Sequence, residues 1–173
     1  MKNIFVTGPM RIGKSSIIKK ILNSSVMKHL KIDGYFTVPE VEGDRIVGYS
    51  IRDFYGSTYN FAHVDLANEL IFDRYHINPT VFDNFASGII TRAMKEADIF
   101  VVDEIGVIES DASLFKNQLL ACLNSDLLCI GVFQERAGWF KTLIHGRPDT
   151  QMIYVTSENR NNVHQYILRE MKK

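Results

Sequence analysis

Short apolar runs alternate with amphipathic stretches along most of the chain. The apolar run at 4–7 predicts a strand, and apolar residues at 17, 18, 21 and 22 repeat with helical spacing and predict a helix over 14–22. Further strands are expected at 97–104, 127–133 and 152–156, and further helices at 111–123, 137–145 and 161–171. Strands that alternate with helices predict an α/β fold with a mostly parallel sheet.

The middle of the chain departs from this alternation. Two β-rich runs flank Glu42-Gly43-Asp44 and predict an antiparallel hairpin inserted into the sheet, with Pro39 placing the first run at an edge or bending it. Asn78-Pro79 predicts a helix start, and that helix extends to about Glu96. Asp111 is expected to cap the helix that follows it. No repeat or linker interrupts the pattern, so residues 1–173 are expected to form a single domain.

A phosphate-binding pattern lies between the first strand and the first helix. The eight residues Gly8, Pro9, Met10, Arg11, Ile12, Gly13, Lys14 and Ser15 match GxxxxGKS/T at each fixed position, and Ser16 follows. Backbone N–H groups of such a loop wrap the β-phosphate, the lysine reaches the β- and γ-phosphates, and the hydroxyl binds Mg²⁺. Arg11 either contacts phosphate or extends into solvent.

An acidic pair ends the apolar strand at 97–104. Asp103 is the candidate metal-binding acid that a phosphate loop requires. Glu104 is placed to orient and polarise an attacking water, the alternative being a structural acid. Neighbouring residues on a regular strand point to opposite faces, so Glu104 reaches the γ-phosphate only if the strand turns there, which Gly106 favours.

Cationic candidates follow the acidic pair. Arg136 and Arg147 each lie in a predicted loop and could contact the γ-phosphate, the alternative for each being a surface arginine. An arginine-rich kinase lid could fit only around 134–147, which disfavours a kinase. The sequence "DEIG" also reads as DxxG, but the chain has no NKxD or TKxD motif, which disfavours a GTP-dependent switch.

The composition limits the kinds of partner and the cellular location that we expect for this protein. Lys plus Arg equals Asp plus Glu at 20 each, so the chain lacks the basic excess of a nucleic-acid-coating domain. No apolar run is long enough to span a membrane, and the apolar core at the N-terminus is too short for a signal peptide. The two cysteines, Cys122 and Cys129, are expected as reduced thiols. We expect a cytoplasmic monomer.

With these motifs placed, the chain resembles a family: the small P-loop nucleoside-triphosphatases of thermophiles and their human cancer-related relative. The resemblance is carried, in order, by "VTGPMRIGKSS", "GYFTVPEVEGDRIVGYSI", "FAHV", "RYHIN", "VVDEIG" and "GRPDTQMIYVTSENRN". It implies a three-layer, RecA-like α/β/α core and Mg²⁺-dependent hydrolysis of nucleoside triphosphates with broad base tolerance. It also places Asn159 and Arg160 near the base. "VIES" after "DEIG" and the stretch "QERAGWF" depart from the family pattern.

The expected activity is therefore hydrolysis of ATP, GTP or other nucleoside triphosphates. Glu104 would position water against a γ-phosphate held by Lys14, by the loop amides, and by Mg²⁺ on Ser15 and Asp103. Two alternatives remain: a nucleoside or nucleotide kinase that uses the same loop, and a nucleotide-dependent switch that binds a partner.

Overall fold

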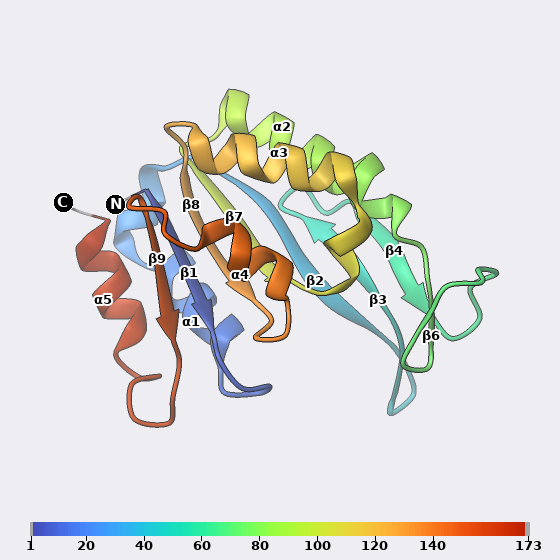
Figure 1. The fold of residues 1–173 in the computed structure, drawn as a ribbon. Helices are drawn as coiled ribbons and strands as arrows, with labels where there is room; N and C mark the ends of the chain where they lie inside the picture. Colours follow the sequence, from blue (N-terminus) through green and yellow to red (C-terminus); the bar gives the residue numbers. More distant parts are fainter. Residues whose placement is uncertain (1, 172–173) are drawn as a thin grey trace.

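Nine strands form one open, mixed sheet in the computed structural model, which describes residues 2–171 (Figure 1). The strands are β1 (Asn3–Thr7), β2 (Ile32–Glu42), β3 (Arg45–Asp53), β4 (Thr58–His63), β5 (Ile71–Phe72), β6 (Tyr75–Ile77), β7 (Ile99–Ile105), β8 (Leu128–Phe133) and β9 (Thr150–Tyr154). Their order is β5-β6-β4-β3-β2-β7-β8-β1-β9. In this order, the neighbours from β2 through β7, β8 and β1 to β9 pair in parallel. The neighbours from β2 through β3, β4 and β6 to β5 pair antiparallel. The predicted α/β fold is confirmed.

Helices cover both faces of the parallel half and complete three layers. They are α1 (Lys14–Leu22), α2 (Ser87–Glu96), α3 (Ser113–Asn124), α4 (Gly138–Ile144) and α5 (Val163–Glu170), with short turns of 3₁₀-helix at η1 (Ser25–His29) and η3 (Ile108–Asp111) and of π-helix at η2 (Phe82–Ala86). Figure 1 shows α2 and α3 side by side on one face and α1 and α5 on the other. Within residues 2–171, no helix has the length and apolar character needed to cross a bilayer.

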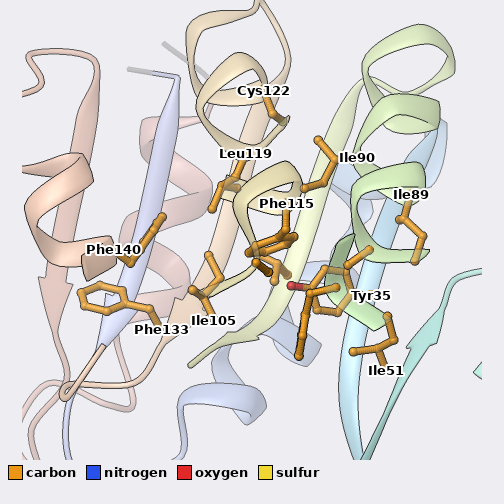
Figure 2. Packing of buried hydrophobic residues seen from close by; sticks show 14 of the residues in the cluster. Tyr35, Ile51, Ile89, Ile90, Ile105, Phe115, Leu119, Cys122, Phe133 and Phe140 are labelled. Carbon is orange, nitrogen blue, oxygen red and sulfur yellow. The ribbon is translucent and has the colours of Figure 1, made fainter. Parts of the chain in front are cut away.

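The strands at the centre of the sheet carry continuous apolar runs because both of their faces are buried. On β7, Phe100 and Val102 pack with the α2–α3 side, whereas Ile99 and Val101 pack with the α1–α5 side. Figure 2 shows Phe115 and Leu119 of α3 directed into the first of these two cores. A continuous apolar run is typical of such a doubly covered parallel strand.

The predicted hairpin is confirmed and is part of a larger antiparallel unit. Strands β2 and β3 turn at Gly43, which has a φ of 58°. Pro39 lies beyond the last residue of β2 that pairs with β7, where β2 has a neighbour on one side only. Strands β4, β5 and β6 then extend the sheet. These strands are short, and polar residues interrupt β4 and β6. They therefore lack the long apolar runs by which a strand is predicted from sequence.

The start of α3 differs from the prediction. Asp111 ends η3, its side chain is exposed, and α3 begins at Ser113 without a side-chain cap from its own segment. Instead, Asp83 of η2 accepts a hydrogen bond from the Phe115 N–H at 2.9 Å. The expected capping role of Asp111 is therefore wrong, because a carboxylate from a neighbouring helix satisfies the first turn.

Candidate active site

The phosphate-loop segment joins β1 to α1 at the carboxyl edge of the parallel strands. Gly8 has a φ of 139°, and a Cβ atom there would lie 2.6 Å from the carbonyl oxygen of Val155, just past β9. Gly13 precedes α1 with a φ of 106°. Both positions need glycine, one for close approach of two backbones and one for its left-handed conformation. A tight turn of this kind can direct successive backbone N–H groups toward an anion.

Two side chains at the start of α1 are already directed at the loop and at the neighbouring acid. The Lys14 ammonium donates hydrogen bonds to the carbonyl oxygens of Gly8 and Pro9, each at 2.9 Å. The Ser15 hydroxyl donates to Asp103 Oδ1 at 3.1 Å. Residues 88 positions apart in sequence therefore meet where a metal ion between loop and acid would lie.

Asp103 and Glu104 lie on the same side of the strand because β7 is irregular at this point. Asp103 pairs with Val132 of β8 and Ile105 pairs with Phe133, so Glu104 is an extra residue that has no partner on β8. Such a bulge removes the alternation of side chains between the two faces. Both carboxylates line one cleft as a result. The proposed role of Glu104 requires that it not point to the opposite face from Asp103. The bulge provides this arrangement, rather than a turn at the following Gly106.

Asp103 is an acid in a poorly solvated place. Only 6 % of the residue is exposed. Burial raises the pKa of Asp103 to about 6, with the hydrogen bond from Ser15 opposing the shift and the Glu104 charge adding to it. A buried carboxylate of this kind gains more from a nearby cation than a solvated one does, because little water competes for it.

The cleft encloses about 730 Å³ and has two walls. One wall is the phosphate loop with the start of α1, and the other comes from the β2–β3 hairpin, β7 and the segment after β8. The lining residues are Gly8, Met10, Arg11, Gly13, Lys14, Ser15, Ser16, Thr37, Pro39, Tyr49, Asp103, Glu104, Gln134, Glu135 and Arg136. Of the residues expected from sequence at the phosphates, Pro9 and Ile12 belong to the loop but do not line the cleft.

Gln134 is the main residue that the sequence prediction missed. It follows β8 directly, and its Nε2 donates a hydrogen bond to Glu104 Oε1 at 2.8 Å. Its backbone N–H donates to the Ile105 carbonyl, also at 2.8 Å. Polar residues just past the ends of parallel strands gather at one edge of the sheet. The rule that identified Asp103 could therefore have identified Gln134 as well.

The two candidate arginines lie in different places. Arg136 lines the cleft, and its guanidinium carbon lies 5.2 Å from the ring centre of Phe72 on β5. Arg147 precedes β9 and therefore lies at the amino ends of the parallel strands, away from the cleft at their carboxyl ends. It donates to both carboxylate oxygens of Asp149 and to the Leu123 carbonyl. The structure brings only Arg136 to the phosphate loop.

Asn159 and Arg160 follow β9 and lie outside the walls of the cleft. The Asn159 side chain closes a turn: its Oδ1 accepts from the Thr156 N–H and its Nδ2 donates to the Tyr154 carbonyl, both at 2.8 Å. The loop nevertheless starts beside the phosphate loop, because Val155 contacts Gly8. A contact between these residues and a nucleotide base stays a prediction.

The donor set suits a hard divalent cation. Ser15 and Asp103 offer a hydroxyl and a carboxylate oxygen, which are ligands that Mg²⁺ prefers, and two protein ligands suffice when phosphate oxygens and waters supply the others. The raised pKa of Asp103 also fits, since a metal ion would relieve the cost of keeping that carboxylate charged in a buried place.

Comparisons with known proteins agree with this geometry. A family model described as NTPase matches residues 3–168. The nucleoside-triphosphatase THEP1 of Thermotoga maritima is 26% identical over 169 residues, which cover 98% of this chain and 95% of the relative. The cancer-related nucleoside-triphosphatase of Homo sapiens is 25% identical over 175 residues, covering 94% and 92%.

Two solved structures share the fold over nearly the whole chain. The crystal structure of THEP1 from Aquifex aeolicus has a TM-score of 0.79 at 23% identity and covers 99% of both chains. The solution structure of a human cancer-related nucleoside triphosphatase has a TM-score of 0.83 at 24% identity and covers 99% of this chain and 97% of its own. At this identity the likeness shows the fold.

Proposed function

The chain belongs to the NTPase family, and on that premise we propose that it hydrolyses nucleoside triphosphates with Mg²⁺ to diphosphate and phosphate. The observation that carries the proposal is the meeting of three groups in one cleft. Ser15 contacts Asp103 at 3.1 Å, and the bulge in β7 brings Glu104 to the same side. Two candidate metal ligands and a candidate water-orienting group thus lie beside the candidate phosphate loop.

Each residue has a distinct task in this proposal. The loop amides and the Lys14 ammonium bind the β- and γ-phosphates. Mg²⁺ on Ser15 and Asp103 would neutralise charge on the phosphate oxygens. Glu104 accepts a hydrogen bond from the attacking water and orients it toward the γ-phosphorus, while the Gln134 amide fixes the direction of the Glu104 carboxylate. Arg136 supplies positive charge to the transition state.

Substitutions at Lys14 and Glu104 test this assignment. Glu104→Ala should lower kcat by roughly 10²- to 10⁴-fold and leave nucleotide affinity unchanged, because Glu104 contacts water rather than nucleotide. Lys14→Ala should weaken both turnover and binding. The measurements are phosphate release from ATP, GTP, CTP and UTP, and titration with a fluorescent nucleotide. Wild-type turnover in Glu104→Ala would refute the water-orienting role.

Broad base tolerance is part of the same proposal. The cleft walls contain the phosphate loop, acids and the hairpin, and Asn159 and Arg160, the residues expected near the base, lie outside them. Comparable kcat/KM values for the four triphosphates are therefore expected. A preference of more than about a hundredfold for one base, roughly what one or two good hydrogen bonds provide, would contradict this expectation.

A kinase is the second candidate, favoured by one observation. Thr37, Pro39 and Tyr49 form a wall of the cleft on the side of Glu104 that faces away from β1. A phosphoryl acceptor approaching the γ-phosphate would meet that wall. Incubation of the protein with MgATP and a panel of nucleosides and nucleoside monophosphates, followed by ³¹P NMR, separates the two functions. A phosphorylated acceptor, with no phosphate released in its absence, would identify a transferase.

A further inference from the structure

The two peptide units that flank Gly106, two residues past Glu104, are each held by a side chain. The Gly106 N–H donates to both carboxylate oxygens of Glu109, each at 3.0 Å. The Gly106 carbonyl oxygen accepts a hydrogen bond from Trp139 Nε1 at 2.8 Å. Glu109 lies in η3 and Trp139 in α4, so two separate elements fix one turn of backbone.

This turn is in contact with the cleft through Gln134. The Gln134 backbone N–H donates to the Ile105 carbonyl at 2.8 Å, and that carbonyl belongs to the same peptide unit as the Gly106 N–H. A Cβ atom built on Gly106 would lie 3.1 Å from both Gln134 Nε2 and Glu109 Oε2, so these two side chains lie close to the turn. The same Nε2 donates to Glu104 Oε1 at 2.8 Å. An unbroken series of contacts therefore runs from Glu109 through Gly106 and Gln134 to the carboxylate of Glu104.

Hydrophobic packing alone does not explain why a glutamate occupies position 109 and a tryptophan position 139. Glu109 is only 3 % exposed, and burying a carboxylate is costly unless specific hydrogen bonds compensate. A hydrophobic residue of similar size would fill the same space at lower cost. Trp139 packs edge-on against Phe115 and Phe140, a contact that phenylalanine could also make. What a substitute would lose in each case is the bond to Gly106.

We propose that Glu109 and Trp139 are positioning residues for the hydrolytic reaction. By fixing the backbone on both sides of Gly106 they fix Gln134, which is hydrogen-bonded to the same turn, and its amide in turn sets the direction in which the Glu104 carboxylate faces the phosphates. The inference rests on the proposed role of Glu104. Placement matters because a reacting group displaced by about 1 Å can lose on the order of a hundredfold in rate.

Two variants test the inference independently. Glu109→Gln keeps the size of the side chain but cannot offer two carboxylate oxygens to the Gly106 N–H. Trp139→Phe keeps an aromatic ring but removes the donor to the Gly106 carbonyl. Each should lower kcat tenfold or more and change nucleotide affinity less than twofold. The matched control is Phe140→Leu, a buried neighbour in α4, which should lower the melting temperature and leave kcat within about twofold.

A double-mutant cycle distinguishes positioning from general damage to the fold. If Glu109 acts through Glu104, then Glu109→Gln should change kcat less than twofold in a Glu104→Ala background. If the two losses multiply, Glu109 does not act through Glu104 and the inference is overturned.

A readout without substrate separates this inference from the proposed function. The side-chain amide signals of Gln134 in ¹H–¹⁵N spectra should shift in Glu109→Gln and in Trp139→Phe, and should stay in place in Phe140→Leu. Unmoved Gln134 signals in both variants would overturn the positioning role even if the protein hydrolyses nucleotides. Shifted signals in a protein whose Glu104→Ala variant keeps full turnover would support the contact series and refute the role of Glu104 instead.

Discussion

At the scale of single residues, location relative to the two edges of the sheet separates two arginines that look alike in sequence. Arg136 follows β8 at the carboxyl edge and lines the cleft. Arg147 precedes β9 at the amino edge, where Asp149 and the Leu123 carbonyl take up its donors, and its guanidinium lowers the pKa of Asp149. Arg136 thus lines the cleft, whereas the donors of Arg147 are taken up by bonds within the fold.

This contrast predicts opposite results for two alanine substitutions. Arg136→Ala should lower kcat by roughly a hundredfold or more without lowering stability, because a cation at the γ-phosphate contributes mainly to the transition state. Arg147→Ala should lower the free energy of unfolding by about 1–2 kcal/mol and spare kcat. Phosphate release and urea unfolding, measured on both variants, provide the check. An unchanged kcat in Arg136→Ala would mean that Arg136 does not act at the phosphates, and a large loss in Arg147→Ala would contradict its purely structural role.

At the scale of elements, α3 depends on a carboxylate from another helix. Asp83 of η2 bonds the Phe115 N–H in the first turn of α3, whereas Asp111, nearer in sequence, is exposed. Asp83→Ala should therefore lower the free energy of unfolding by about 1 kcal/mol, the usual contribution of a helix cap. Asp111→Ala should change it by less than about 0.5 kcal/mol. Thermal melts of both variants measure the difference, and a reversed order would contradict the assignment.

The cap of α3 is one of several features that differ in how well they could be predicted from the sequence. The loop from Gly8 to Ser15 and the acid Asp103 could be predicted because their signals are local: a fixed spacing, and an apolar run that ends in an acid. The cap from Asp83 could not be predicted, since it depends on how two helices pack. The bulge that brings Glu104 beside Asp103 depends on the pairing of β7 with β8, which no single segment encodes. The strand-end rule that indicates Asp103 applies to Gln134 as well, because Gln134 directly follows β8.

At the scale of the whole molecule, the candidate active site joins two halves of one sheet. The parallel half provides the phosphate loop and the acids, and the antiparallel half provides Thr37, Pro39 and Tyr49. The stacking of Arg136 on Phe72 links the segment after β8 to the far edge strand β5. Any motion between the halves would therefore change the cleft and the placement of Arg136 together.

Glu109 connects the candidate active site to the stability of the whole fold. Burial raises the pKa of Glu109 to about 7, hydrogen bonds from backbone N–H groups oppose the shift, and the nearby Glu104 charge adds to it. An unfolded chain releases the same proton near pH 4.3. Between about pH 4.5 and pH 7 the folded protein therefore holds more protons than the unfolded chain. Its free energy of unfolding must fall as the pH rises through that window, by on the order of 3 kcal/mol from this residue.

Urea unfolding at pH 5 and pH 7.5 measures that fall, and Glu109→Gln provides the comparison because its amide does not titrate. The wild-type protein should lose stability from the lower to the higher pH, and the variant should lose less. The loss left in the variant comes mainly from Asp103, whose pKa is also raised by burial, to about 6. Equal losses in the two proteins would show that Glu109 titrates normally in the fold. Its carboxylate would then be stabilised by the Gly106 N–H far more than its burial indicates.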